Sequence, residues 1–251
     1  MTDQSPVEET FISHLIELRN RLVKATIGIL LVCAGLLAWP GPSRIYDIIA
    51  MPMLAALPAG SKMIATGVIS PFLVPMKVTL VIAFVLALPW VLYQLWAFIA
   101  PGLYAHEKRL IAPLVISSSA LFMSGVAFCY FFVFGRVFKF IGEFAPSSIA
   151  VTPDIENYLD FVMSMCLAFG ATFEVPVVVV ILVRMGVVSV EKLKEVRPYA
   201  IVGAFVIAAV VTPPDIVSQL ALAVPMCLLF ELGLLVAPVF VRVTQAPEEP
   251  T

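Results

Sequence analysis

Residues 94–110 read QLWAFIAPGLYAHEKRL. In this stretch an apolar run that contains Trp96 meets Pro101 and then turns into a charged segment that includes Lys108 and Arg109. An interfacial aromatic residue, then a helix breaker, then cations are typical of a helix that leaves the bilayer on the cytosolic side. The stretch therefore predicts the end of a transmembrane helix and its direction.

Glu107 lies beside the cations of this stretch. An anchoring loop gains nothing from a carboxylate at that place. The carboxylate is therefore either a local partner for Lys108 and Arg109 or a receptor for a cation from another molecule. The pattern of residues leaves both alternatives open.

The composition sets the class of the protein. Hydrophobic residues make up 61% of the 251 residues, charged residues 13%, and the mean hydropathy is +1.05. A chain of this composition is an integral membrane protein that crosses the bilayer several times. Its net charge of -2 argues against nucleic acid as a partner.

Several kinds of chemistry have no motif here. All four cysteines lie in apolar runs without disulfide or metal-ligand spacing. No phosphate-binding loop, zinc-protease motif or dinucleotide fingerprint is present. We therefore expect no enzyme activity, no metal and no cofactor.

Residues 1–21 predict an amphipathic helix. Leu15 and Leu18 fall on one side of it, and Glu17 and Arg21 fall on another. Such a helix is expected to lie on the cytosolic membrane surface and to bend into the first span. A local i,i+4 pair with Arg21 is the alternative to an intermolecular role for Glu17.

The rest of the chain reads as six spans in one membrane domain, residues 1–251. Each of the first four is long enough for a hydrocarbon core of about 30 Å. The predicted spans are 22–39, 76–100, 110–134, 158–183, 199–211 and 216–234, with 235–251 as a tail. The segment 43–75 is long and apolar, so we expect an ordered extracytoplasmic cap with a surface helix over 46–57 broken at Pro52.

The fifth and sixth spans are predicted to be short. Thirteen residues, 199–211, rise only about 20 Å. The turn after them, residues 212–215, is followed by a sixth span with Gln219 one turn into it. Asp215 is placed to cap that helix at its first residues.

The cations predict the orientation. Ten of them, from Arg19 to Arg242, fall in the N-terminal segment, the second and fourth loops and the tail. Lysine and arginine are retained on the cytosolic side. Both termini are therefore expected in the cytosol.

Six short motifs occur in order on the predicted sides of this topology. They are 14–19 (HLIELR), 70–72 (SPF), 96–103 (WAFIAPGL), 173–176 (FEVP), 197–199 (RPY) and 212–215 (TPPD). Together they resemble TatC, the polytopic receptor subunit of the twin-arginine protein translocase. The resemblance covers nearly the whole chain.

The resemblance implies a concave all-α membrane protein of the bacterial cytoplasmic (inner) membrane. Glu17 and Glu107 would approach each other at the cytosolic face and receive the paired arginines of a signal peptide, with Arg19, Phe98 and Leu103 of the same motifs beside them. Two carboxylates suit two guanidinium forks, which lysine cannot reproduce. The implied partners are folded passenger proteins with such peptides and single-span subunits of the TatA/TatB type, in a complex of several copies.

Polar residues at membrane depth need a partner, since a carboxylate there costs roughly 2.5 to 3.5 kcal/mol. In a protein similar to this family, Glu174 would line the concave face against which a partner subunit or passenger packs. The short fifth and sixth spans leave a polar notch with Thr212, Asp215 and Gln219, so we expect these residues, with Glu174 across the concavity, to mark where a single-span partner docks. A protonated Glu174 bonded to a neighbouring helix is one alternative. The alternative function is a small ion- or proton-coupled transporter with Glu174 as the ion site.

Overall fold

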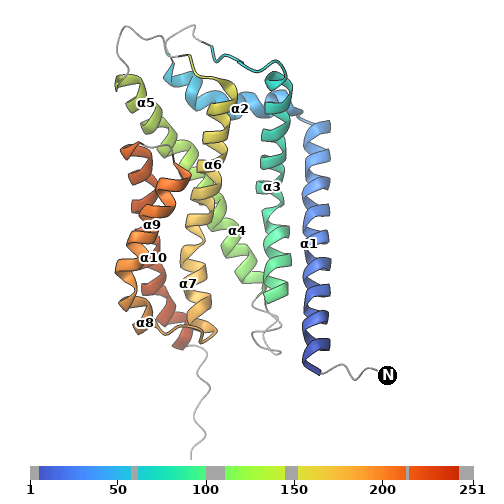
Figure 1. Cartoon of the computed structure of the whole chain (residues 1–251), viewed down its shortest axis with the longest axis vertical. Coiled ribbons are helices and arrows are strands. Elements are labelled where there is room, and N and C mark those ends of the chain that lie inside the picture. Colours follow the sequence, from blue (N-terminus) through green and yellow to red (C-terminus); the bar gives the residue numbers. More distant parts are fainter. Residues whose placement is uncertain (1–5, 58–61, 100–110, 145–151, 213–214, 243–251) are drawn as a thin grey trace, which may run out of the picture. The chain divides into compact units, whose positions relative to one another are not determined.

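The computed structural model describes residues 6–57, 62–99, 111–144, 152–212 and 215–242, which are almost wholly helical. Across these residues the only strand-like pairing is an isolated bridge between Ile64 and Asp154. The elements, in order, are α1 (Pro6–Ala38), α2 (Pro42–Ala56), α3 (Ser70–Ile99), α4 (Ile111–Phe128), the π-helical turn η3 (Cys129–Val133), α5 (Phe134–Phe144), α6 (Ile155–Phe173), α7 (Val175–Arg184), α8 (Val190–Glu195), α9 (Arg197–Val211) and α10 (Ile216–Arg242) (Figure 1). The predicted all-α class is confirmed.

Five helical stretches of the described chain are long and apolar enough to cross a bilayer. They are Ser13–Ala38, Ser70–Ile99, Ala112–Glu143, Ile155–Arg184 and Ile216–Val239. The sixth apolar helix, α9, has 15 residues and rises only about 22 Å, which is less than the hydrocarbon core of about 30 Å. The predicted shortness of the fifth span is confirmed.

The sixth span differs from the prediction. We expected it to be short and to end at residue 234, but α10 has 27 residues and ends at Arg242. At 1.5 Å per residue it rises about 40 Å, so it is long enough to cross the bilayer. The helix α10 continues through both Pro225 and Pro238.

The first helix also differs from the expectation. The amphipathic segment 1–21 and the span 22–39 were expected to meet at a bend, but α1 is a single helix of 33 residues, about 50 Å long. No proline interrupts its hydrogen-bond ladder after Pro6. The helix ends where Gly41 adopts a φ of 90° and its N–H donates to the carbonyl of Leu36 at 3.0 Å.

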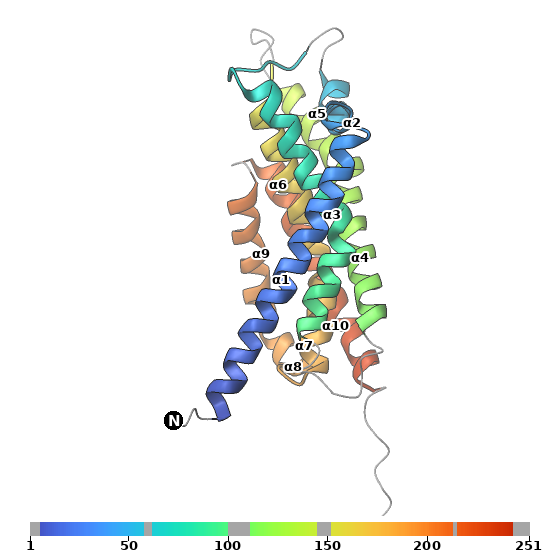
Figure 2. The same ribbon diagram turned by 90° about the vertical axis from the view of Figure 1, so that its right-hand side faces the viewer.

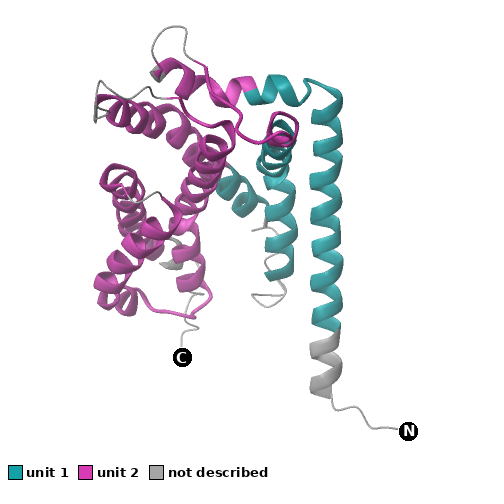
Figure 3. Ribbon diagram, turned by 45° about the horizontal axis from the view of Figure 1, so that its top comes forward, with its two compact units in different colours: residues 1–46, 75–119 teal, residues 47–74, 120–251 magenta. Residues whose placement is uncertain are grey.

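The chain divides into two compact units, which Figure 3 colours separately. Residues 1–46 and 75–119 form unit 1. Within it α1 and α3 lie side by side (Figure 2). The indole of Trp90 covers Gly28, which leaves no room for a Cβ, and its Nε1 donates to the carbonyl of Lys24 at 2.9 Å. The glycine therefore lets a large ring sit against the backbone of α1.

Unit 2 comprises residues 47–74 and 120–251. Its core contains aromatic rings along α4, η3, α5 and α6, with Phe134 and Phe169 fully buried. The ring of Phe128 lies 5.8 Å from that of Phe169, and Phe138 lies 5.5 Å from Tyr158. Rings at these separations attract each other beyond the effect of burial alone.

The predicted cap segment 43–75 is ordered where it is described, but its helix is not broken at Pro52 as we expected. The helix α2 runs through Pro52 to Ala56. A proline has no N–H for the carbonyl four residues earlier, which here belongs to Ile48. That carbonyl instead accepts from the hydroxyl of Tyr130 at 2.7 Å, and the hydroxyl of Tyr158 donates to the next carbonyl, Ile49, at 3.0 Å. Two tyrosines therefore tie α2 to the rest of unit 2.

A second contact of the cap segment is made by Asp154, the N-cap of α6. One carboxylate oxygen accepts from the N–H groups of Glu156 and Asn157, and the other accepts from the N–H of Thr66 at 3.0 Å and its hydroxyl at 2.7 Å. Ser70 adds a bond from its hydroxyl to Glu156 at 2.8 Å. The Thr66 hydroxyl first, and then the N–H groups, hold the pKa of Asp154 below its usual value.

Gly125 is required by close packing within unit 2. A Cβ on Gly125 would lie 2.5 Å from the carbonyl oxygen of Phe169, and a backbone atom cannot move aside cheaply. We expect Gly125→Leu to destabilise the protein by roughly 1–3 kcal/mol through overpacking. Gly135→Leu is the control, since nothing lies within 4 Å of a Cβ at that position. Thermal unfolding in detergent measures both, and equal midpoints would contradict the proposed packing.

Acid should weaken the tie between Asp154 and the cap segment. Because the folded pKa is lowered, the ionised carboxylate stabilises the fold above about pH 4, and this stability is lost as the pH falls through the lowered value. Asp154→Ala should reduce the unfolding midpoint at pH 7 and reduce the further loss that occurs as the pH falls below about 4. Thr66→Val should shrink the same acid-dependent loss by a smaller amount. An Asp154→Ala protein with the native acid dependence would show that another group is responsible.

Candidate functional site

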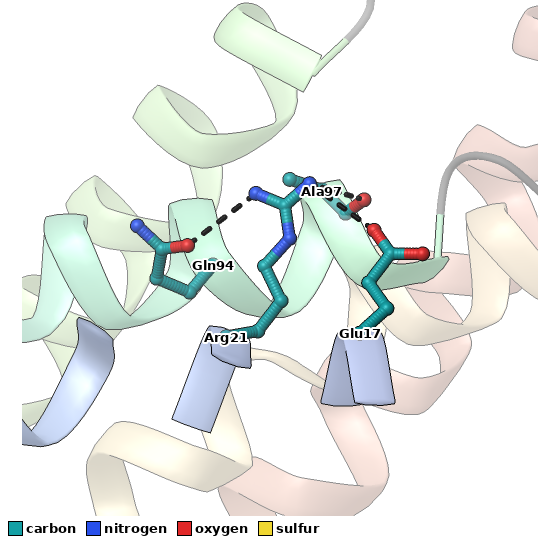
Figure 4. A network of polar contacts seen from close by, with 4 residues as sticks. All are labelled: Glu17, Arg21, Gln94 and Ala97. Atoms are coloured by element: carbon teal, nitrogen blue, oxygen red, sulfur yellow. Dashed lines mark hydrogen bonds and ion pairs between the residues drawn. The ribbon is translucent and has the colours of Figure 1, made fainter. Parts of the chain in front are cut away.

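The side chain of Glu17 belongs to a polar network within unit 1, shown in Figure 4. The guanidinium of Arg21 lies at its centre. Its Nη2 donates to Glu17 Oε1 at 3.3 Å and to the carbonyl of Ala97 at 3.5 Å, and its Nη1 donates to Gln94 Oε1 at 3.4 Å. The network therefore joins the N-terminal half of α1 to the last turns of α3.

Every contact in this network is long. Charge-assisted bonds between a guanidinium and a carboxylate are usually about 2.7–2.9 Å. The side chains of Arg21 and Glu17 are also 26% and 36% exposed, so water competes for both groups. An ion pair of this kind contributes about 0–1 kcal/mol. The carboxylate of Glu17 is thus held weakly.

Gln94 and several motif residues also belong to this part of unit 1. Gln94 is almost fully buried, with 3% of its surface exposed. The ring of Phe98 stacks on His14 with centroids 4.5 Å apart. Arg19 is exposed and donates to Asn20 at 3.3 Å. The predicted site residues Glu17 and Phe98 therefore lie on two helices that contact each other, and Arg19 projects from one of them.

Glu107 and Leu103 lie outside the described residues, so their predicted places stay predictions. The described part of α3 ends at Ile99, and the chain position of Glu107 is only eight residues further on. Eight extended residues span at most about 29 Å. The sequence distance is therefore compatible with the predicted approach of Glu107 to Glu17.

Glu174 lies at a break between two helices of unit 2. It ends α6 and begins α7, and its N–H donates to the carbonyls of Ala171 and Thr172. Pro176 causes the break, because it lacks the N–H that the carbonyl of Thr172 would accept in a continuous helix. The side chain is half-buried, beside the N-terminal end of α7, where the helix dipole favours a carboxylate.

The turn between α9 and α10 carries the other polar residues. The hydroxyl of Thr212 donates to the carbonyl of Ala208 at 2.8 Å at the end of α9. The carboxylate of Asp215 accepts from the N–H of Ser218 at 2.7 Å, so the predicted cap of the last helix is confirmed. Gln219 is half-buried and donates to the carbonyl of Phe205 on α9 at 3.4 Å.

Glu174 and Gln219 do not form one cluster. The residue of α10 that lies beside the α6–α7 break is Gly233, where a Cβ would lie 3.1 Å from the Cα of Pro176. Gln219 precedes Gly233 by fourteen residues, which is about 21 Å of helix. The two polar positions therefore lie about four turns apart along α10.

Three polar contacts were not predicted. Arg197 donates to Glu231 at 2.7 Å and joins the start of α9 to α10. Gln94 and Asp154 are the other two residues that sequence reasoning missed. A lone amide in an apolar run signals Gln94, and an aspartate two residues before a glutamate at a helix start signals Asp154. Their partners are far away in the chain, so the sequence could not name them.

The sequence matches one protein family over most of its length. The profile of the family described as the Sec-independent protein translocase protein, TatC, matches residues 13–225. The chain belongs to the TatC family. It is 49% identical over 235 residues to the TatC protein of Haemophilus influenzae, which covers 93% of this chain and 91% of that protein. With Escherichia coli K12 TatC the identity is 47% over 245 residues, and the coverage is 97% and 94%.

A solved TatC structure has the same fold. The crystal structure of the twin-arginine translocase receptor TatC matches with a TM-score of 0.79 at 36% identity, and the match covers 90% of this chain and 98% of that one. Together with the five long apolar helices and the shorter α9, it confirms the TatC resemblance and the six-helix fold. The chain is a multi-pass membrane protein.

Proposed function

We propose that this TatC-family chain is the receptor and core subunit of a twin-arginine protein export system. It binds twin-arginine signal peptides at the cytosolic face and recruits single-span partners that translocate folded proteins. The observation that carries the proposal is the place of Glu17. Its carboxylate is half-buried, weakly held, and next to the end of α3 that leads to Glu107.

The chemistry of two carboxylates supports this role. A guanidinium fork makes two parallel bonds to a carboxylate, and a lysine ammonium acts as a single point charge. Two forks on one peptide therefore need two carboxylates, which Glu17 and Glu107 supply. Arg19, Phe98 and Leu103 would contact the peptide around them. The relatives named above are themselves TatC proteins, and the matching crystal structure is of a twin-arginine translocase receptor.

The distribution of cations supports the location. Both termini lie in the cytosol in this proposal, because the basic residues gather on the side of the N-terminal segment and the tail. The membrane is then the bacterial cytoplasmic membrane. This orientation puts Glu17 on the side from which a newly made passenger arrives.

Single-span partners of the TatA/TatB type would dock along unit 2. Polar groups at membrane depth favour polar partners on a neighbouring helix, and Gln219, Asp215, Thr212 and Glu174 are such groups. Because about 21 Å of α10 separates Gln219 from the level of Glu174, one partner helix would meet the two positions about four turns apart. The concave face expected from the resemblance stays a prediction.

The transporter alternative receives less support. It needs Glu174 as an ion site, yet the family to which the chain belongs is described as a protein translocase component. Glu174 at the break before Pro176 suits either role. Transport of labelled ions or small solutes by purified protein in liposomes would revive this alternative.

Removing either carboxylate should weaken peptide binding. A bond to a charged group contributes about 1.5–3 kcal/mol, so Glu17→Gln or Glu107→Ala should lower the affinity for a twin-arginine peptide about ten- to hundredfold. Fluorescence anisotropy with a labelled synthetic peptide on the purified full chain measures this. A peptide with both arginines changed to lysine should bind the native chain weakly.

The control for these variants is Glu191→Ala. Glu191 is an exposed glutamate in the first turn of α8, and its loss removes the same charge without touching the site. It should leave the affinity unchanged. Native affinity in both Glu17→Gln and Glu107→Ala would rule out the carboxylates as the peptide receptor.

Gln219→Leu should impair transport while peptide capture stays native. The substitution keeps the size of the side chain and removes the amide that a partner helix would meet. Export of a folded reporter in cells measures transport, and the same anisotropy assay measures capture. Leu220→Ile, a volume-conserving change at the next, lipid-exposed position, is the control. Full export with Gln219→Leu would contradict the docking role and show that Gln219 serves only its internal bond to Phe205.

A further inference from the structure

We propose that Arg21 is a resident competitor for the carboxylate of Glu17, which an incoming peptide arginine displaces. The proposal rests on the proposed role of Glu17 in signal-peptide binding. In the chain without a peptide, Arg21 presents to Glu17 the same chemical group that a peptide arginine would bring, a guanidinium nitrogen at 3.3 Å (Figure 4). The carboxylate therefore already has Arg21 as a partner, but it is bound weakly.

The other contacts of Arg21 make it displaceable. Loss of the Glu17 bond would leave its Nη1 on the buried amide oxygen of Gln94 and its Nη2 on the carbonyl of Ala97. A guanidinium without acceptors in this part-buried place would be costly. Since two acceptors stay, the displaced guanidinium is still bonded. Gln94 and Ala97 thus hold the competitor beside the carboxylate in both states.

The Ala97 carbonyl adds a structural reason for this arrangement. It lies in the last turn of α3, which ends at Ile99, where carbonyls lack helical donors and attract cations. The bond from Arg21 gives this carbonyl both a donor and a positive charge. The end of α3 is therefore bonded to Arg21 before and after a peptide arrives. Only the carboxylate of Glu17 exchanges its partner, from Arg21 to a peptide arginine.

The expected size of the effect follows from the weakness of the pair. An exposed ion pair is closed about one to five times as often as it is open. A competitor of that strength divides the apparent affinity by one plus this ratio, which is about two- to sixfold. The same factor applies to every ligand of Glu17, so the preference for arginine over lysine in the peptide should not change.

Arg21→Gln should therefore tighten the binding of a synthetic twin-arginine peptide about two- to sixfold. A residue that merely orients α1 would weaken binding when lost, so the sign of the change separates the two roles. Arg21→Lys keeps the charge and gives up the planar fork, and it should fall between the native chain and Arg21→Gln. Thermal unfolding of each variant checks that it is folded.

A double-mutant cycle isolates the competition. In a Glu17→Gln background the competitor has no carboxylate to occupy, so adding Arg21→Gln should leave the remaining affinity unchanged. Lys24→Gln removes the same charge from an exposed position one turn further along α1. This control should change the affinity less than twofold if general charge is unimportant.

The outcomes are distinct. Tightening by Arg21→Gln that vanishes in the Glu17→Gln background supports the proposal. Unchanged or weaker binding, or tightening that persists without Glu17, overturns it while the receptor function stands. If the native chain does not prefer the twin-arginine peptide over its lysine counterpart, the proposed function fails, and the competition at Glu17 fails with it.

Discussion

Every peptide group of a helix in hydrocarbon has to find its hydrogen-bond partner inside the protein. Proline removes a helical donor at several places in this chain, and the structure shows two different responses. Behind Pro52, the Tyr130 hydroxyl supplies the missing bond to Ile48. Before Pro176, α6 ends and α7 begins at Glu174. At Pro52 a side chain therefore takes over from the backbone, whereas at Pro176 the helix itself is interrupted.

Three charged residues cap a helix end or bond to one. Asp215 caps α10, Asp154 caps α6, and Arg21 reaches the last turn of α3. Charges at such places are stabilised by free backbone groups and helix dipoles. These three charges therefore lie where backbone groups can satisfy them.

The strengths of the ion contacts fit their proposed tasks. Asp154 accepts four hydrogen bonds at 2.7–3.1 Å and holds the cap segment to α6. Among the described residues Glu17 has one long contact, at 3.3 Å, to a partly exposed arginine. A structural carboxylate benefits from complete satisfaction, whereas a carboxylate that must exchange partners has to be held loosely. The two acids of similar chemistry thus suit opposite roles.

The sequence by itself determined the fold class, the presence of membrane-spanning helices and the family. Apolar runs of about 20 residues can only be helices in a bilayer, and six motifs in order identified TatC. The shortness of the fifth span and the cap at Asp215 were also predictable, since both depend on residues close together in the chain. Features that depend on neighbouring residues can be predicted from a short stretch of sequence.

Only the tertiary structure decided the long-range choices. It extended α10 to Arg242 and α2 through Pro52, because packing and a distant tyrosine hydroxyl offset what proline costs a lone helix. It placed Gln219 about four turns from the level of Glu174 along α10. It also gave Arg21 its acceptors Gln94 and Ala97, more than seventy residues away. No periodicity within one helix specifies which residue of another helix will face it.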